Sequence, residues 1–212
     1  MASSIARQLA ASPLGRAGGA LLHDLLVPAS LAQLNREVTD LSMSAKLSQR
    51  SAFNDVVCGD PDRALMHIEA GPILDGLYTG ADLAEWVQSV SGVPMRPLGA
   101  HTSYSVYSGD HFLGPHRDID GCDLTVIVVV RDDTPGGQPL WLWPSRADEP
   151  VDRIRQNPQH SCRSIVGAPG QAVVIMGRVV PHQLPQMKPG CTRIVAPLCF
   201  TVDPSFQASE AP

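Results

Sequence analysis

The segment "YSGDHFLGPHRDIDGCDLTVIVVV", Tyr107 to Val130, decides which fold this sequence predicts. Its first part is rich in Gly, Asp and His, which are common in turns. Its last part is a run of β-branched residues that is typical of a buried strand. His116 and Asp118 therefore lie at the entrance of that strand. In an extended chain, residues i and i+2 point the same way, so both side chains can contact one ion while Arg117 points elsewhere.

A third metal ligand is then expected far along the chain, on a neighbouring strand. His182 lies in "GRVVPHQLPQ", directly after the apolar run "QAVVIM". Two imidazoles and one carboxylate form the facial triad of non-haem Fe(II) enzymes, which leaves coordination positions open for a co-substrate and O₂. Arg193 follows at the start of the apolar run "CTRIVAPLCF". A buried guanidinium needs an anionic partner, and a carboxylate fits it best.

The second half of the chain has the sequence pattern of an all-β fold. Turn signals such as "DDTPGG", "GAPGQ" and "MKPG" separate short β-prone runs, which predicts a sandwich or barrel. The polar segment Ser145–His160 is expected to be a surface loop or a short helix. The expected strands are Thr102–Ser108, Asp123–Val130, Pro139–Trp143, Cys162–Val166, Gln171–Met176 and Thr192–Thr201.

The first half reads as helical. Leucine and valine recur at spacings of three and four over Pro28–Met43, for which Ser30 is the expected N-cap. Residues Thr79–Gly92 repeat the pattern, with Trp86 on the apolar face and Gly92 at the stop. We expect one domain over 21–212, with helical support over 21–98 and a β core over 99–203. Residues 1–20 are expected to be a flexible N-terminus.

Composition excludes several classes of protein. The chain has 212 residues and a net charge of −5, and this lack of basic excess argues against a nucleic-acid partner. No apolar run approaches the length that spans a bilayer, so no membrane partner is expected. Five cysteines without a CxxC pair fit reduced thiols in the cytoplasm better than a disulfide framework. The sequence is compatible with a homodimer.

Three motifs together resemble the Fe(II)/2-oxoglutarate-dependent dioxygenases, and most of all their prolyl-4-hydroxylase-like branch. The motifs are "YSGDHFLGPHRD", "PGGQPLWLWP" and "GRVVPHQLPQMKPGCTRIV". The resemblance covers roughly residues 103–202. It implies a mainly β fold, a double-stranded β-helix (a distorted jelly roll), with supporting N-terminal α-helices. It also implies Fe(II) as cofactor, with 2-oxoglutarate and O₂ as co-substrates.

The same resemblance assigns roles to individual residues. His116, Asp118 and His182 would be the iron ligands, and Arg193 would bind the distal carboxylate of 2-oxoglutarate. Tyr107 would be a further co-substrate contact, and Thr125, which is also expected to contact the co-substrate, would line the pocket. The other expected wall residues are Ile127, Val129 and Leu140, with Trp141 or Trp143 as further candidates and Trp86 bracing a lid.

Alternatives stay open at this point. His116 and Asp118 also fit a turn stabilised by local hydrogen bonds, and His182 fits a core histidine. Arg193 fits a structural ion pair with Asp120 or Asp123. The expected function is hydroxylation, or another C–H oxidation, of a small amino-acid-like or natural-product substrate. The rival functions are a peptidyl hydroxylase with the same site and a non-catalytic β-helix that binds a small acid.

Overall fold

The structure is a computed structural model that describes residues 2–50 and 61–209. Its helices are α1 Ala2–Ala11, α2 Pro13–Arg16, α3 Pro28–Leu41, α4 Pro72–Thr79, α5 Ala81–Ser91, α6 Val151–Gln156 and α7 Pro204–Ser209. Its strands are β1 Ala20–Asp24, β2 Lys46–Arg50, β3 Arg63–Glu69, β4 Met95–Pro97, β5 Ser103–Ser108, β6 Phe112–His116, β7 Leu124–Asp132, β8 Leu140–Leu142, β9 Arg163–Ile165, β10 Gln171–Ile175, β11 His182–Leu184 and β12 Thr192–Val202. All six expected strands of the second half are confirmed.

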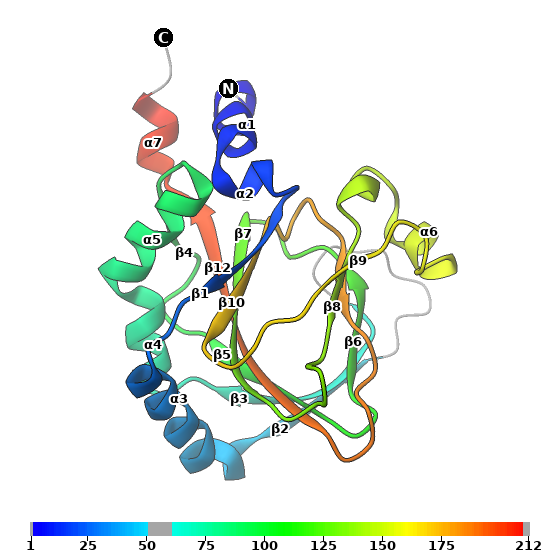
Figure 1. Cartoon of the computed structure of the whole chain (residues 1–212). Coiled ribbons are helices and arrows are strands. Elements are labelled where there is room, and N and C mark those ends of the chain that lie inside the picture. The colour runs from blue at the N-terminus through cyan, green and yellow to red at the C-terminus, as the bar shows by residue number, and fades with distance from the viewer. Residues whose placement is uncertain (1, 51–60, 210–212) are drawn as a thin grey trace.

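The strands pair antiparallel in one sheet that folds back on itself (Figure 1). The order is β1-β10-β7-β12-β5-β3-β6-β11-β8-β9, with β2 beside β3 and β4 beside β12. The fold-back occurs at β3, because one edge of this strand pairs first with β6, at Arg63 and Ala64, and then with β5, from Met66 to Glu69, while β2 pairs along its other edge. Strands β6, β11, β8 and β9 therefore face the larger part of the sheet. This arrangement confirms the double-stranded β-helix with supporting helices.

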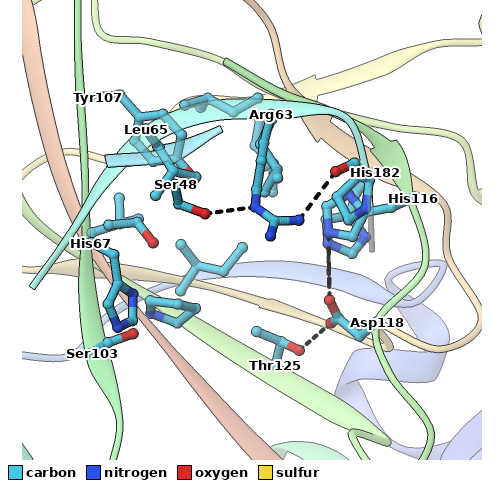
Figure 2. A pocket seen from close by; sticks show the side chains of 18 of the residues that line it. Ser48, Arg63, Leu65, His67, Ser103, Tyr107, His116, Asp118, Thr125 and His182 are labelled. Carbon is cyan, nitrogen blue, oxygen red and sulfur yellow. Dashed lines mark hydrogen bonds and ion pairs between the residues drawn. The ribbon is translucent and has the colours of Figure 1, made fainter. Parts of the chain in front are cut away.

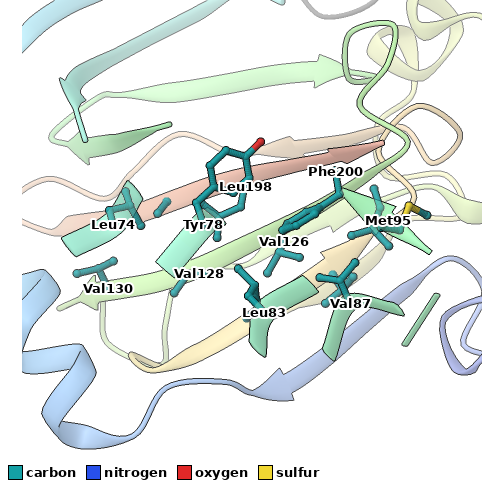
Figure 3. Close-up of a cluster of buried hydrophobic side chains, with 14 of the residues drawn as sticks. Leu74, Tyr78, Leu83, Val87, Met95, Val126, Val128, Val130, Leu198 and Phe200 are labelled. Atoms are coloured by element: carbon teal, nitrogen blue, oxygen red, sulfur yellow. The ribbon is translucent and has the colours of Figure 1, made fainter. Parts of the chain in front are cut away.

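Strand β7 separates two hydrophobic cores. Successive side chains of a strand point to opposite faces, so Val126, Val128 and Val130 pack toward the helices and Ile127 points into the barrel. Figure 3 shows the helix-side core, in which residues of α4 and α5 cover β7 and β12. Because both faces of β7 are buried, its sequence is a continuous apolar run and not an alternating one.

Helices α5 and α3 were both expected from the sequence. Helix α5 ends at Gly92, which adopts a left-handed conformation with φ 74°, as the sequence predicted. Helix α3 also forms, but the N-cap prediction for Ser30 is wrong. The helix begins at Pro28, whose missing N–H suits the first turn, so the cap falls on Val27. Helix α4 was not predicted.

The start of α4 depends on a buried carboxylate from α3. Glu37 accepts hydrogen bonds from the amides of Ile73 (2.8 Å) and Leu74 (3.1 Å) at the first turn of α4. The hydroxyl of Tyr104 on β5 donates a third, at 3.2 Å. A carboxylate at a helix N-terminus satisfies free amides and complements the helix dipole. This contact attaches the helices to the sheet.

The division into helical support and β core is wrong for several elements. Strands β1, β2, β3 and β4 lie within residues expected to be helical or flexible. Strands β1, β3 and β4 are stabilised by pairing with β10, β5, β6 and β12 from the second half, and β2 pairs with β3. The N-terminal segment also differs from the expectation of flexibility. Residues 2–11 and 13–16 are helical, Leu14 is fully buried, and Ser12 caps α2 by accepting from Gly15 N.

The expectation of reduced thiols is wrong for one pair. Cys122 and Cys199 form a disulfide with a Cα–Cα distance of 5.2 Å, because the antiparallel pairing of β7 and β12 brings these residues together. Cys162 and Cys191 are free, and Cys58 lies outside the described residues. The disulfide removes the reason for placing the protein in a reducing compartment. Among the described residues, no helix is both long enough and apolar enough to cross a membrane.

Candidate metal centre

His116, Asp118 and His182 converge at one place inside the barrel (Figure 2). His116 is the last residue of β6 and His182 the first of β11, and these two residues are paired across the strands. One ligand atom from each of the three side chains lies within 4.8 Å of the others. The Asp118 Oδ1 atom is 3.6 Å from His116 Nε2 and 3.5 Å from His182 Nε2. The structure thus brings the three predicted ligands together. This convergence favours a metal site over a local turn at His116 and Asp118 and over a core histidine at His182.

Both imidazole rings are oriented by their own backbone. His116 Nδ1 lies 2.8 Å from the carbonyl oxygen of Gly114, and His182 Nδ1 lies 3.0 Å from that of Val180. A carbonyl oxygen only accepts, so each Nδ1 carries the hydrogen and each Nε2 presents a lone pair. Second contacts of this kind fix the tautomer of metal-binding histidines. The donor set and its orientation fit one divalent metal ion, and Fe(II) in particular.

Asp118 is positioned by a residue that the sequence did not identify. Its backbone amide donates to the carbonyl of Gly177, at 2.9 Å. A Cβ at position 177 would lie 1.8 Å from Asp118 Oδ2, so only glycine leaves room for the carboxylate. On the other side, the Thr125 hydroxyl donates to Asp118 Oδ2. In the sequence, Gly177 directly follows the apolar run "QAVVIM" and precedes His182, and this position was the signal that could have indicated its role.

The charges of the triad suit metal binding. Burial and the neighbouring His182 lower the pKa of His116, so this ring is neutral at neutral pH. Burial by itself would raise the pKa of Asp118, but the two histidines hold it well below its usual range. Burial would lower the pKa of His182, yet the adjacent Asp118 carboxylate raises it overall. The site therefore presents an ionised carboxylate between two imidazoles.

The triad opens into a cavity of about 740 Å³. Its size lies in the range of small-molecule pockets, and its walls come from both halves of the barrel. Of the residues expected there, Tyr107, Thr125, Ile127, Leu140 and Arg193 line the cavity. The expectation is wrong for Val129, Trp141 and Trp143, none of which lines it.

Each of these three has a structural reason to lie elsewhere. Val129 is fully buried beside Gly167, where an added Cβ would lie 3.1 Å from Val129 Cγ2. Trp143 is fully buried and its indole N–H donates to the Pro158 carbonyl at 2.9 Å. Trp141 is in the middle of β8, between two residues that face the barrel core. A side chain at this position points to the other face of the strand.

Arg193 lies in the cavity wall and forms an ion pair that the sequence analysis did not name. Its partner is Asp132, at the end of β7, and only 1% of the arginine side chain and 2% of the aspartate side chain are exposed. The proposed pairing with Asp120 or Asp123 is wrong, because both of these contact Arg178. Within the described chain, Arg193 Nε is buried without a hydrogen-bond partner. The guanidinium thus keeps a donor for a ligand.

The glycine pair after β7 forms the loop that holds Asp132, the ion-pair partner of Arg193. Gly136 and Gly137 both have positive φ (79° and 76°), which permits the tight loop. Asp132 accepts from the amides of Thr134 (3.0 Å) and Gln138 (2.9 Å) across this loop. The motif "PGGQP" therefore acts through Asp132 on Arg193. Gln138 also donates to the Pro185 carbonyl at 2.9 Å, which connects the loop to the segment after β11.

Tyr107 lies beside Arg193 on the neighbouring strand β5, in register with it. Burial raises the pKa of its hydroxyl to about 12, although Ser105 and Arg193 act in the opposite direction. Tyr107 is therefore a neutral hydrogen-bond donor at every physiological pH. Its position next to a buried guanidinium makes a pair of donors at one end of the cavity.

Residue Arg117, between the two proximal ligands, points away from the metal as expected. It donates to the carbonyls of Ala147 (2.5 Å) and Glu149 (2.7 Å), so it anchors the segment Ser145–His160. This segment contains the short helix α6, and none of its residues is among the described residues that line the cavity. The bracing role expected for Trp86 is wrong. This side chain packs in the helix-side core and contacts His23 edge to face.

No family model and no curated protein matches this sequence. Solved structures do match its fold. A prolyl-4-hydroxylase from Pseudomonas putida has a TM-score of 0.59 and 13% identity, over 96% of this chain and 100% of that one. SnoN, a non-haem α-ketoglutarate-dependent epimerase of nogalamycin biosynthesis, has a TM-score of 0.69 and 13% identity, over 95% of this chain and 82% of that one.

This protein has the fold of the Fe(II)/2-oxoglutarate-dependent oxygenases. HygX from Streptomyces hygroscopicus, solved with nickel and 2-oxoglutarate bound, shares this oxygenase fold with a TM-score of 0.65 and 13% identity, over 87% of this chain and 83% of that one. The likeness at this identity concerns the fold. The His–Asp–His triad within it is a property of the chain itself.

Proposed function

We propose that this protein is an Fe(II)- and 2-oxoglutarate-dependent oxygenase that hydroxylates, or otherwise oxidises at a C–H bond, a small amino-acid-like or natural-product substrate. The observation that carries the proposal is the buried triad of His116, Asp118 and His182, which opens into a cavity with Arg193 in its wall. Bound Fe(II) with 2-oxoglutarate and O₂ would supply the oxidation and yield succinate and CO₂.

The chain's own groups would bind, orient and shield the reactants. The two imidazole Nε2 atoms and the Asp118 carboxylate would hold the metal, while Gly114 and Val180 keep the rings in place. Arg193 would bind the distal carboxylate of the co-substrate, with Tyr107 as a second donor beside it. The Thr125 hydroxyl donates a hydrogen bond to Asp118, so its main role would be to orient that carboxylate. A contact with the co-substrate would be an additional role.

A small substrate is favoured over a polypeptide by the segment Ser145–His160. A peptide groove would need a mobile loop beside the cavity, and this segment was the candidate. It is held by Arg117, by the Trp143 indole, and by Arg146, which donates to the carbonyls of Asn157 and Arg153.

The proposal is tested by metal and co-substrate binding, followed by turnover. Purified protein with Fe(II) and 2-oxoglutarate, without O₂, should develop the weak visible charge-transfer band of that chelate. The variant His182→Ala should lose the band and all succinate formation while keeping its circular dichroism spectrum. Incubation with O₂ and a metabolite extract, and separately with proline-containing peptides, would then identify the substrate class. Succinate coupled only to peptides would contradict the small-molecule substrate, and activity in His182→Ala would contradict the metal centre.

A further inference from the structure

We infer that the disulfide between Cys122 and Cys199 is a positioning element of the metal centre, so that its reduction by a dithiol weakens metal binding at the triad. This inference rests on the proposed function, because it assigns a regulation to the same site. Cys122 lies in the loop between Asp118 and β7, and its partner Cys199 lies on β12. Cys199 also lines the cavity into which the triad opens. The bond therefore joins the loop that carries Asp118 to the wall of the cavity.

Two contacts connect the disulfide to the Asp118 carboxylate. The Sγ atom of Cys122 lies 3.2 Å from Thr125 Oγ1 and 4.0 Å from Asp118 Oδ2. The Thr125 hydroxyl donates to the same Oδ2 atom, as Figure 2 shows. A sulfur atom in a disulfide carries no hydrogen, so the single hydroxyl hydrogen of Thr125 is directed to Asp118. The disulfide therefore packs against the hydroxyl group that orients the carboxylate.

The loop between Asp118 and Cys122 is too short to absorb a movement of the disulfide. The amide of Cys122 donates to the Ile119 carbonyl at 3.1 Å, and Gly121 has a positive φ of 90°, so these residues form a tight turn. Ile119 and Asp120 are exposed, whereas Cys122 is fully buried. Cys122 is thus the buried end of the turn, and a shift of Cys122 is passed directly to Asp118.

Reduction would change this arrangement in two ways. Two thiol groups cannot stay as close together as two bonded sulfur atoms, so Cys122 and Cys199 must separate. At the same time, Cys122 gains an S–H donor near Thr125 Oγ1 and Asp118 Oδ2. A hydrogen bond from this donor to the carboxylate would compete with a metal ion for the oxygen lone pairs. Both changes weaken a ligand whose geometry tolerates little displacement.

The reductant would reach the bond through the cavity. Cys122 is fully buried, whereas Cys199 is partly buried and lines the cavity, so a thiolate of a small dithiol would attack Cys199 Sγ. This step forms a mixed disulfide with Cys199 and releases Cys122 as a thiolate, which takes up a proton. The second thiol of the reductant then closes the reductant's own disulfide and releases Cys199, which is also protonated. Two electrons and two protons thus pass from the dithiol to the protein.

The experiment compares the Mn(II) affinity of oxidised full-length protein with that of protein reduced by dithiothreitol and then freed of the reductant without O₂. Mn(II) prefers oxygen ligands to thiols, so the newly formed thiols should not capture it, and the electron paramagnetic resonance signal of free Mn(II) measures binding. The reduced form should bind Mn(II) about 10- to 100-fold more weakly, the loss that is usual for groups supporting a metal ligand. A disulfide that only stabilises the fold would leave this affinity unchanged in the folded protein.

Variants separate the disulfide from other thiols. Cys122→Ala, Cys199→Ala should bind Mn(II) more weakly than the oxidised wild type and should no longer respond to dithiothreitol. Cys162→Ala, Cys191→Ala is the matched control, because both cysteines are free, and it should respond as the wild type does. Thr125→Val should lower the affinity of the oxidised form and reduce the difference between the two forms, whereas Thr125→Ser keeps the hydroxyl and should preserve both.

Thermodynamic linkage supplies a second measurement. If the disulfide raises metal affinity by a given factor, bound metal must make the disulfide harder to reduce by the same factor. Redox titration with dithiothreitol, followed by alkylation and mass spectrometry, should show this shift when Mn(II) is in excess. Equal Mn(II) affinity of oxidised and reduced wild-type protein would overturn the inference and leave the proposed function standing, whether or not the variants fold. Failure of the oxidised protein to bind Mn(II) at all contradicts the proposed function, and the inference with it.

Discussion

The carbonyl of Gly177 accepts a hydrogen bond from the backbone amide of Asp118, over 2.9 Å. This bond joins the loop after β6 to the segment after β10, two parts of the chain that each lead to a member of the triad. The missing side chain of Gly177 leaves the space that the Asp118 carboxylate occupies. The position of the Asp118 carboxylate therefore depends on a residue that belongs to neither side of the triad.

Gly177→Ala should abolish high-affinity metal binding, because the new methyl group would lie 1.8 Å from Asp118 Oδ2 in the present geometry. Either the carboxylate or the backbone must move, and ligand geometry tolerates little displacement. The measurement is Fe(II) or Zn(II) affinity by competition with a chromophoric chelator. Gly76→Ala in α4 is the control, since nothing lies within 4 Å of its added Cβ. Wild-type affinity in Gly177→Ala would show that the loop adapts freely.

Arg193→Ala should raise the concentration of 2-oxoglutarate needed for half-saturation by orders of magnitude. Loss of one partner of a buried charged pair costs about 2–5 kcal/mol, and Arg193→Lys should recover only part because it lacks the planar fork. The titration follows the charge-transfer band of the Fe(II) chelate. Arg178→Ala should bind 2-oxoglutarate normally, because Arg178 pairs with Asp120 and Asp123 outside the cavity. The reverse pattern would assign the co-substrate to Arg178.

Asp132→Asn should destabilise the protein at neutral pH by about 3–5 kcal/mol, because it leaves the buried Arg193 without its counter-ion. Burial alone would raise the pKa of Asp132, but the amides of Gln138 and Thr134 and the Arg193 charge lower it overall. A lowered folded-state pKa stabilises the protein above the unfolded value of about 3.9 and loses this effect as the pH falls through the folded value.

Urea unfolding from pH 7 down to pH 3 measures this contribution. The stability of the wild type should fall toward acid by more than that of Asp132→Asn. The exposed residue Asp40 on α3 offers a control, and Asp40→Asn should follow the wild-type curve. Identical pH profiles for wild type and Asp132→Asn would show that the ion pair makes no net contribution.

Removal of the disulfide should lower the free energy of unfolding by about 2–4 kcal/mol, since the bond between Cys122 and Cys199 closes a loop across 77 residues of sequence. The double variant Cys122→Ala, Cys199→Ala is compared with wild type by denaturant unfolding. Cys162→Ala, Cys191→Ala is the matched control, because both cysteines are free. Peptide mapping without reductant should find Cys122 linked to Cys199, and finding both as thiols would contradict the pairing.

The sequence by itself predicted the β core, the positions of its main strands along the chain and the residues of the triad. Continuous β-branched runs such as Leu124–Val130 predict buried strands from local pattern alone. The spacing of His116 and Asp118 predicts a shared direction for their side chains. The distal ligand followed from chemistry, because a facial triad requires a second imidazole and His182 directly follows an apolar run.

Tertiary structure alone decided the features that depend on pairing across long distances. Strands β1, β3 and β4 are stabilised by partners from the second half, and β2 is stabilised by β3, so no local periodicity reveals them. The ion pair of Arg193 with Asp132 follows from the antiparallel register of β7 and β12, in which these residues are partners. The same pairing places Cys199 opposite Thr125, three residues after Cys122, to which Cys199 is bonded. Register is a relation between two strands, and neither strand's sequence contains it alone. For the same reason, the cavity that contains the triad became visible only when β3 joined the two halves of the barrel.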